Sequence, residues 1–189
     1  MRRLRFRLML VVAALLVGCA IANAQQTGLD LDGHAVNPLR AELGKLTVLI
    51  FIRRDCPVSS RYAPEIQRIS KQYADLASFW LVDPDKSDSP KLIRKYLADY
   101  GYHLPALRDP EHALAKLSRV QITPEAAVFD REHRLVYDGR IDDRYFDLSR
   151  ARAAPTTHEL EDAIHAALTG NALAKDEVRG VGCYISDLD

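Results

Sequence analysis

The sequence feature that most constrains the fold is an unbroken apolar run, LTVLIFI at residues 46–52, that leads into Cys56 and Pro57. Apolar and β-branched residues in succession, without alternation, are typical of a central strand whose two faces are both buried. The next residues have a helical period, with apolar side chains at spacings of four and three: Tyr62, Ile66, Ile69 and Tyr73. The sequence therefore predicts a buried sheet with Cys56 at the turn between its central strand and a helix.

Other segments have the pattern of strands. Residues 78–83 form a second predicted strand, and residues 29–34 form a short strand and turn near the start. Residues 126–129 and 135–137 alternate around the polar turn 130–134, which predicts a hairpin. Strands that alternate with helices indicate a mixed α/β sheet.

A helix is predicted to begin after Ser89, because a capping side chain stands directly before Pro90. It is predicted to end at Gly101, a residue type that favours the helix C-terminus. Its expected core-facing side chains are Leu92, Ile93, Tyr96, Leu97 and Tyr100. A shorter helix is predicted over residues 111–118.

The last predicted helix starts at a capping box made by Thr156 and Glu159, and it is closed by Gly170. Residues 171–189 show weak periodicity and carry Cys183. The histidines and the helical tyrosines are interpreted as surface and packing residues. A set of acidic residues is interpreted as a solvated loop: Asp138, Asp142, Asp143 and Asp147.

Residues 1–24 have the three parts of an export signal: a basic start, an apolar run at 8–17 and then small residues. The sequence is compatible with two alternative processing sites. The motif ANA at 22–24 would release a domain of residues 25–189, whereas LVGC at 16–19 resembles a lipoprotein signal that would leave a lipid on Cys19. Either one predicts the bacterial periplasm or cell envelope, with membrane attachment only through that lipid.

The charge of the remaining domain argues against nucleic-acid binding. The whole chain has 26 basic and 26 acidic residues, and four of the arginines lie in residues 1–24. Without them 22 basic residues remain against 26 acidic ones, a net charge of −4. A mildly acidic domain lacks the basic surface that binds phosphates.

Two cysteines remain outside residues 1–24, and they lie 127 positions apart, at 56 and 183. Cys56 sits where a strand meets a helix that starts with Pro57, so unpaired backbone N–H groups and the helix dipole favour its thiolate. Arg53 and Arg54 would lower its pKa further, and Asp55 would oppose them. Cys56 is therefore the predicted nucleophile.

The sequence resembles the thioredoxin-like redoxins of the alkyl-hydroperoxide-reductase and thiol-specific-antioxidant superfamily. The resemblance spans residues 28–185 and rests on DCPVSSRYAPEIQRI from Asp55, TPEAAVFD from Thr123, LVYDGRIDDRY from Leu135, and GCYI from Gly182. It implies a thioredoxin-like α/β fold, a central mixed sheet with helices on both faces. It also implies a cis peptide bond between Thr123 and Pro124, opposite Cys56, where the backbone offers an edge to substrate.

The active-site motif departs from the patterns of several relatives. Ser59 stands where thioredoxin-type reductants have their second cysteine, and Ser60 stands where copper chaperones of this fold have theirs. Thiol peroxidases have a hydroxyl residue and a proline where this chain has Arg53 and Leu49. The family alone therefore does not fix the activity.

Cys183 leaves several hypotheses open. It could resolve a disulfide formed at Cys56, form a structural disulfide with it, share a Cu(I) ion with it, or stay unpaired. The first hypothesis predicts an exported thiol–disulfide oxidoreductase without a cofactor, in which Thr123 and Pro124 shape the groove and the partner is a redox protein or a protein disulfide. The alternatives are a copper-handling thiol protein of the cell envelope and a thiol peroxidase.

Overall fold

A computed structural model describes residues 26–42, 44–171 and 179–188. The predicted export signal at residues 1–24, with Cys19 and both processing sites, lies outside these residues. Within the described residues, no helix combines the length and the apolar character needed to cross a bilayer.

The centre of the structure is a seven-stranded mixed sheet in the order β2-β1-β5-β4-β3-β7-β8. Strand β3 (Leu46–Phe51) pairs in parallel with β4 (Ala77–Asp83) and antiparallel with β7 (Glu125–Phe129). The remaining strands are β1 (Gly28–Asp30), β2 (Ala35–Val36), β5 (Ala106–Arg108) and β8 (Leu135–Gly139). The predicted central strand and hairpin are thus confirmed, whereas β5 was not predicted because three residues are too short for a pattern.

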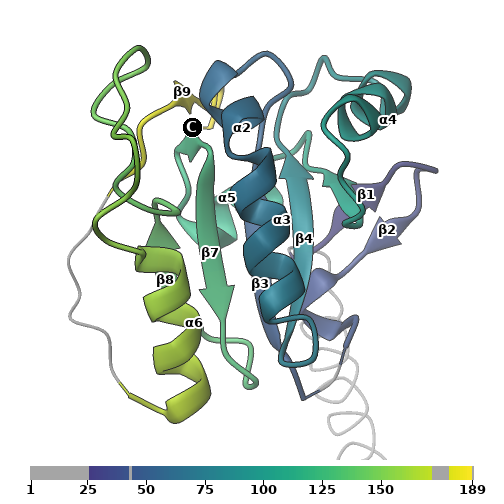
Figure 1. Ribbon diagram of the computed structural model, residues 1–189. Coiled ribbons are helices and arrows are strands. Elements are labelled where there is room, and N and C mark those ends of the chain that lie inside the picture. Colours follow the sequence, from purple (N-terminus) through teal and green to yellow (C-terminus); the bar gives the residue numbers. More distant parts are fainter. Residues whose placement is uncertain (1–25, 43, 172–178, 189) are drawn as a thin grey trace, which may run out of the picture.

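Helices cover both faces of the sheet. Helices α3 (Ala63–Gln72) and α6 (Glu159–Thr169) cross one face, and α5 (Ala113–Ser118) lies behind the sheet (Figure 1). Helix α4 (Pro90–Asp99) adds Tyr96 to the core on the side of α3, and the short 3-10 helix η1 (Pro38–Arg40) adds Leu39 on the side of α5. This is the predicted mixed sheet flanked by helices.

The two cores explain why β3 has no polar alternation. Val48 and Ile50 belong to the core under α3 and α6, while Leu49 and Phe51 belong to the core under α5. Successive side chains of a strand point to opposite faces of the sheet. All four are fully buried because a core covers each of those faces. Burial of each such side chain contributes about 1.5–3 kcal/mol to folding.

The helix predicted after Cys56 is broken in two. Helix α2 (Pro57–Arg61) ends at Tyr62, and α3 begins at the next residue. Pro64 in the first turn of α3 has no N–H to donate to the Ser60 carbonyl, and its ring crowds that carbonyl. The break leaves α2 as a separate turn at the carboxyl end of β3 (Figure 1).

Two details of the predicted helices are wrong. In α4, Ile93 and Tyr96 are buried, but Leu92 and Tyr100 are 39% and 42% exposed, because only a narrow stripe of this helix meets the core. Helix α5 begins at Ala113 rather than at residue 111. The Asp109 carboxylate fixes that start by accepting hydrogen bonds from the backbone N–H groups of its second and third residues.

The predicted capping box of the last helix is also wrong. Helix α6 begins at Glu159, and Thr156 instead bonds through its N–H and its hydroxyl to the Asp143 carboxylate. Asp143 and Asp142 are buried rather than solvated, and Asp142 accepts a hydrogen bond from the Tyr62 hydroxyl. These two carboxylates therefore stabilise the loop before α6 through hydrogen bonds. Tyr62 contributes one of those bonds in addition to its packing in the core.

A second small sheet lies at the end of the main sheet, near α2 (Figure 1). It pairs β6 (Ile122–Thr123) antiparallel with β9 (Cys183–Tyr184), with Thr123 opposite Cys183. The backbone N–H of Ile185 extends this pairing by donating to the Gln121 carbonyl at 2.9 Å. The end of the chain is thereby joined to the segment that precedes Pro124.

Candidate active site

Cys56 occupies the position predicted for it, between β3 and α2. It is the N-terminal capping residue of α2, and Pro57 is the first helical residue, where a missing N–H costs nothing. The Cys56 side chain is fully buried. Its thiol donates a hydrogen bond to the Thr123 carbonyl at 3.1 Å, so Cys56 faces the segment that ends in Pro124.

The peptide bond between Thr123 and Pro124 is cis, as the resemblance predicted. The backbone edge beside it is not open to a substrate, however, because β9 of the same chain pairs with it. The Thr123 hydroxyl also donates a hydrogen bond to the Cys183 carbonyl at 3.2 Å. Thr123 therefore contacts both cysteines, one through its carbonyl and the other through its hydroxyl.

The structure brings Cys183 to Cys56. Both cysteines are free thiols, and Cys183 packs against the core that contains Cys56, where each thiol influences the pKa of the other. Cys183 is half-buried, whereas the next side chain, Tyr184, is 72% exposed. The four residues singled out from the sequence, Cys56, Thr123, Pro124 and Cys183, thus lie at one site.

Gly182 is needed here for close approach rather than for flexibility. A Cβ atom at this position would lie 1.9 Å from the Thr123 carbonyl oxygen and 2.7 Å from its carbon. Only a residue without a side chain lets β9 come this close to β6. The glycine therefore decides whether Cys183 can reach Cys56.

The two thiols differ in acidity. Burial is the largest influence on the Cys56 pKa and raises it, but hydrogen bonds from Cys183, Ser59 and the Val58 N–H favour the thiolate, and the net pKa is lowered. The pKa of Cys183 is raised to about 11, first by burial and then by the hydrogen bond with Cys56. Cys56 therefore ionises before Cys183 and is the better nucleophile near neutral pH.

The two arginines before Cys56 have other partners than its thiol. The Arg53 guanidinium bonds to Asp55 and Asp85 at 2.9 and 3.1 Å, and it also donates to the Tyr184 carbonyl at 3.1 Å. Arg54 donates two hydrogen bonds to the buried Asp88. Arg53 thus links β9 to the residues just before Cys56 by hydrogen bonds. The sequence did not predict this structural role.

A buried carboxyl group, Asp83, lies near these arginines at the end of β4. Burial raises the Asp83 pKa to about 7; the Asp85 N–H partly offsets this effect, and the carboxylates of Asp88 and Asp85 add to it. An ordinary unfolded aspartate has a pKa of about 3.9. The folded protein therefore binds this proton more tightly, and its stability falls as the pH rises from about 4 to 7.

Asp83→Asn removes this pH-dependent cost, because an amide stays neutral and still accepts from the Asp85 N–H. We expect the variant to be about 4 kcal/mol more stable than wild type at pH 8 and unchanged at pH 4. Urea unfolding at both pH values measures the difference. Asp99→Asn, on the exposed side of α4, is the control and should show no such gain. Equal stability of Asp83→Asn and wild type at pH 8 would contradict the assignment.

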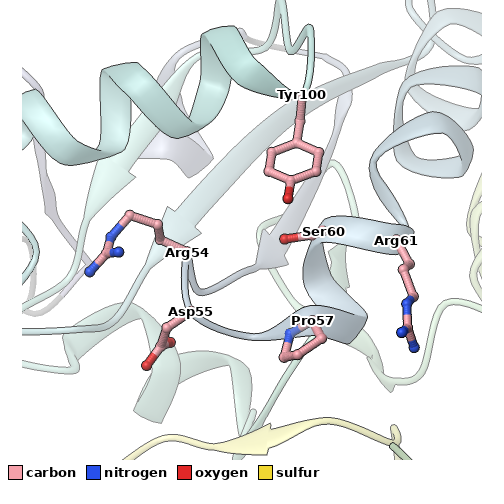
Figure 2. A pocket seen from close by; sticks show the side chains of 6 residues that line it. All are labelled: Arg54, Asp55, Pro57, Ser60, Arg61 and Tyr100. Atoms are coloured by element: carbon pink, nitrogen blue, oxygen red, sulfur yellow. The ribbon is translucent and has the colours of Figure 1, made fainter. Parts of the chain in front are cut away.

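An open pocket of about 400 Å³ lies on the outer side of α2 (Figure 2). Its lining residues are Arg54, Asp55, Pro57, Ser60, Arg61 and Tyr100. The Tyr100 hydroxyl points toward Ser60 across the pocket (Figure 2). The pocket adjoins Pro57, the residue after Cys56, so it gives a partner room beside the site even though the Cys56 thiol itself is covered.

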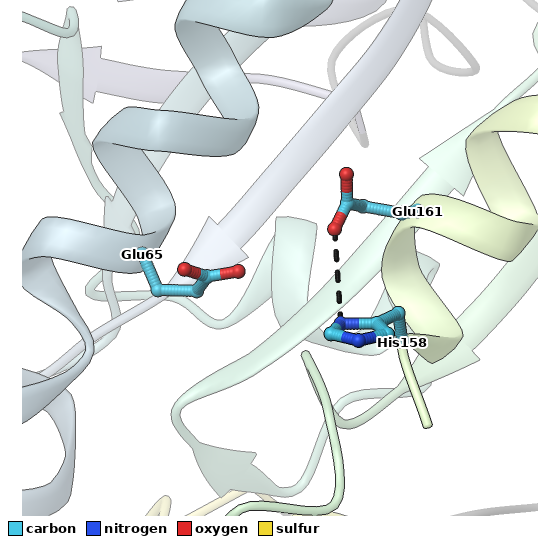
Figure 3. Close-up of side chains that lie close together, drawn as sticks. All are labelled: Glu65, His158 and Glu161. Carbon is cyan, nitrogen blue, oxygen red and sulfur yellow. Dashed lines mark ion pairs between the residues drawn. The ribbon is translucent and has the colours of Figure 1, made fainter. Parts of the chain in front are cut away.

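One group of side chains away from the thiols has the composition of a metal site. Glu65, His158 and Glu161 place ligand atoms within 4.8 Å of one another (Figure 3). The Arg68 guanidinium bonds to both carboxylates, at 2.6 Å to Glu65 and 2.5 Å to Glu161. The Arg68 cation already pairs with both acids, so the group is an ion-pair network that joins α3 to α6.

The order of strands, the cis-proline loop and a cysteine at the start of α2 define a thioredoxin-like redoxin. A sequence model of the AhpC/TSA family matches residues 17–138, and the chain belongs to this family. No curated protein matches the sequence.

Solved structures share the fold. An uncharacterized conserved protein from Geobacillus kaustophilus is 27% identical, with a TM-score of 0.71 over 84% of this chain and 86% of that one. A hypothetical protein from Sinorhizobium meliloti is 23% identical, with a TM-score of 0.70 over 84% and 88%. A secreted disulfide oxidoreductase of Mycobacterium tuberculosis, homologous to E. coli DsbE, is 16% identical, with a TM-score of 0.53 over 75% and 96%.

Proposed function

We propose that this protein is an exported thiol–disulfide oxidoreductase in which Cys56 attacks and Cys183 resolves. The observation that carries the proposal is that two free thiols, 127 positions apart in the sequence, meet at one residue: the Cys56 thiol bonds to the Thr123 carbonyl, and Cys183 pairs with Thr123 across the small sheet. The lowered pKa of Cys56 and the raised pKa of Cys183 support these two roles. Export is supported by the signal pattern of residues 1–24 and by the fold shared with a secreted oxidoreductase.

The reaction takes two exchange steps. The Cys56 thiolate attacks one sulfur of a partner disulfide, which forms a mixed disulfide and releases the other partner sulfur as a thiolate that takes up a proton. Cys183 then loses its proton and attacks the Cys56 sulfur, so that the Cys56–Cys183 disulfide forms and the second partner thiol leaves. Two electrons pass to the partner, and because each step is reversible, the oxidised protein oxidises a dithiol by the same route.

The partner is a protein that presents a disulfide or a dithiol. Reaction at Cys56 requires β9 to move from β6, because β9 pairs with the edge beside Pro124 and the thiol is fully buried. A polypeptide can compete for that edge with its own backbone hydrogen bonds. The pocket beside Pro57 offers it a second contact.

A redox titration tests the proposal. The reduced protein is equilibrated in glutathione buffers of graded potential, and the Cys56–Cys183 disulfide is followed by mass spectrometry. A midpoint between about −120 and −270 mV is expected, the range of exchange catalysts. A midpoint below about −300 mV would identify a structural disulfide instead. Failure to form the bond at any potential would refute the proposal.

The adjacent sulfurs also favour a second candidate function, binding of Cu(I), because two thiolates at close range are soft ligands for this ion. Competition with a chromophoric Cu(I) chelator tests it. Transfer of one Cu(I) equivalent from the chelator to wild type, but not to Cys183→Ser, would support copper handling. Transfer to neither protein would exclude it.

A further inference from the structure

A carboxylate with no exposed surface lies between the two segments that carry the thiol site. Glu125 is the first residue of β7 and follows Pro124 directly. Its Oε1 atom accepts a hydrogen bond from the Gly180 N–H at 2.7 Å. Its Oε2 atom accepts from the N–H groups of Gln121 and Ile122, at 3.3 and 3.4 Å. One side chain thereby links residues 179–185, the Cys183 segment, to the residues that form β6.

We propose that Glu125 is a positioning residue for the exchange reaction, and that it holds the Cys183 segment in place so that Cys183 stays within reach of Cys56. The inference rests on the proposed function, because it assigns to Glu125 a role in the step that Cys183 performs. Glu125 does not contact either thiol through any of its hydrogen bonds. It acts through the backbone on both sides of the site.

The chemistry of the contacts requires a carboxylate. Both of its oxygens are acceptors, and all of the backbone groups that face them are N–H donors. A glutamine has the same shape but only one acceptor oxygen. Its NH₂ group would face either Gly180 or the pair Gln121 and Ile122, donor against donor. The amide can therefore hold one segment or the other, but not both.

The close packing at Gly180 supports the same role. A Cβ atom there would lie 2.9 Å from both the Glu125 Cγ atom and the Pro124 carbonyl oxygen. The Cys183 segment is thus pressed directly onto this side chain. Arg179 adds a cation 3.9 Å from Oε2, and the same guanidinium donates to the Arg119 carbonyl at 3.1 Å.

Burying this charge is costly, which argues for a specific use. Burial raises the pKa of Glu125, and the hydrogen bonds from Gly180, Gln121 and Ile122, together with the Arg179 charge, only partly offset that effect. An apolar residue at the start of β7 would avoid the cost, as the other inward positions of that strand do. An apolar residue, however, could not accept the hydrogen bond from the Gly180 N–H that holds the Cys183 segment.

The test compares Glu125→Gln with wild type in two backgrounds of the full chain. In the first, the Cys56–Cys183 couple is titrated in glutathione buffers. We expect the effective concentration of Cys183 at Cys56 to fall about tenfold, which moves the midpoint about 30 mV toward less reducing values. In the second, all proteins carry Cys183→Ser, and iodoacetamide alkylates Cys56. We expect the alkylation rate to rise about tenfold, because a loosened segment uncovers the buried thiol.

Ile164→Val, a buried change in α6, is the control for a general loss of stability. The proposal is overturned if Glu125→Gln shifts neither the midpoint nor the alkylation rate by more than this control does. If wild type forms no Cys56–Cys183 disulfide, the proposed function fails, and the alkylation arm still decides whether Glu125 holds the segment. Should Glu125→Gln not fold, Gly180→Ala disturbs the same contact from the other side and is expected to give the same two shifts.

Discussion

Replacing Gly182 by alanine is expected to slow closure of the Cys56–Cys183 disulfide by about a hundredfold, while the domain stays folded. The added Cβ atom would lie 1.9 Å from the Thr123 oxygen, so β9 has to leave β6. Forcing one carbon into a packed site costs about 1–3 kcal/mol, and the upper end of that range is a factor of about one hundred. The main sheet does not include β9, so its stability should change little.

The measurement is rapid mixing of reduced protein with oxidised glutathione, followed by acid quenching and quantification of mixed and intramolecular disulfides. Gly182→Ala should accumulate glutathione on Cys56, whereas wild type should pass quickly to the internal disulfide. Gly33→Ala is the control for backbone strain without a steric clash. Gly33 has a positive φ of 91°, which strains an alanine, but a Cβ atom there would meet no other atom within 4 Å. Closure of Gly182→Ala at the wild-type rate would show that this contact does not position Cys183.

The second large effect is expected from replacing each cysteine by serine. Cys56→Ser removes the thiol with the lowered pKa and should reduce exchange with a disulfide peptide by about a thousandfold. Cys183→Ser keeps the attacking thiol and removes the resolving one. It should therefore trap the peptide on Cys56 as a stable mixed disulfide instead of releasing it.

Mass spectrometry distinguishes the two variants directly. The mass of one peptide chain should appear on Cys183→Ser, in the tryptic fragment that contains Cys56, and be absent from Cys56→Ser. The reverse pattern, with the peptide on Cys183 of Cys56→Ser, would exchange the roles of the two thiols. Multiple turnovers by Cys183→Ser would mean that a second partner thiol, rather than Cys183, resolves the intermediate.

The parts of the fold with strong local patterns could be predicted from the sequence. The unbroken apolar run of β3 indicates burial on both faces, and it is confirmed by two cores. The position of Cys56 at the start of α2 follows from the strand before it and Pro57 after it. The cis bond at Pro124 came from the family resemblance rather than from the residues around it.

Contacts between distant segments could not be predicted, because no local pattern encodes them. Strand β9 has two residues, and it exists only because Gly182 lets it approach Thr123, 59 positions earlier. The residues at Thr156 and Glu159 fit a capping box, but the Thr156 hydroxyl bonds to the buried Asp143 carboxylate instead of to the start of α6. Glu125 lies within the motif TPEAAVFD, but the sequence alone indicates no role for it, because the proposed role depends on its hydrogen bond with the distant Gly180.

The pairing of β9 with β6 also separates the reactivity of the protein from its stability. The hydrogen bonds between β9 and β6 lie outside the main sheet, so this pairing can open locally while the main sheet stays intact. Amide hydrogen exchange should show this as faster exchange at Tyr184 and Ile185 than at β3. A sequence change at the exposed Tyr184 can then set how quickly the sulfur chemistry proceeds without touching either core, whereas a change at the buried Ile185 also alters the core under α5.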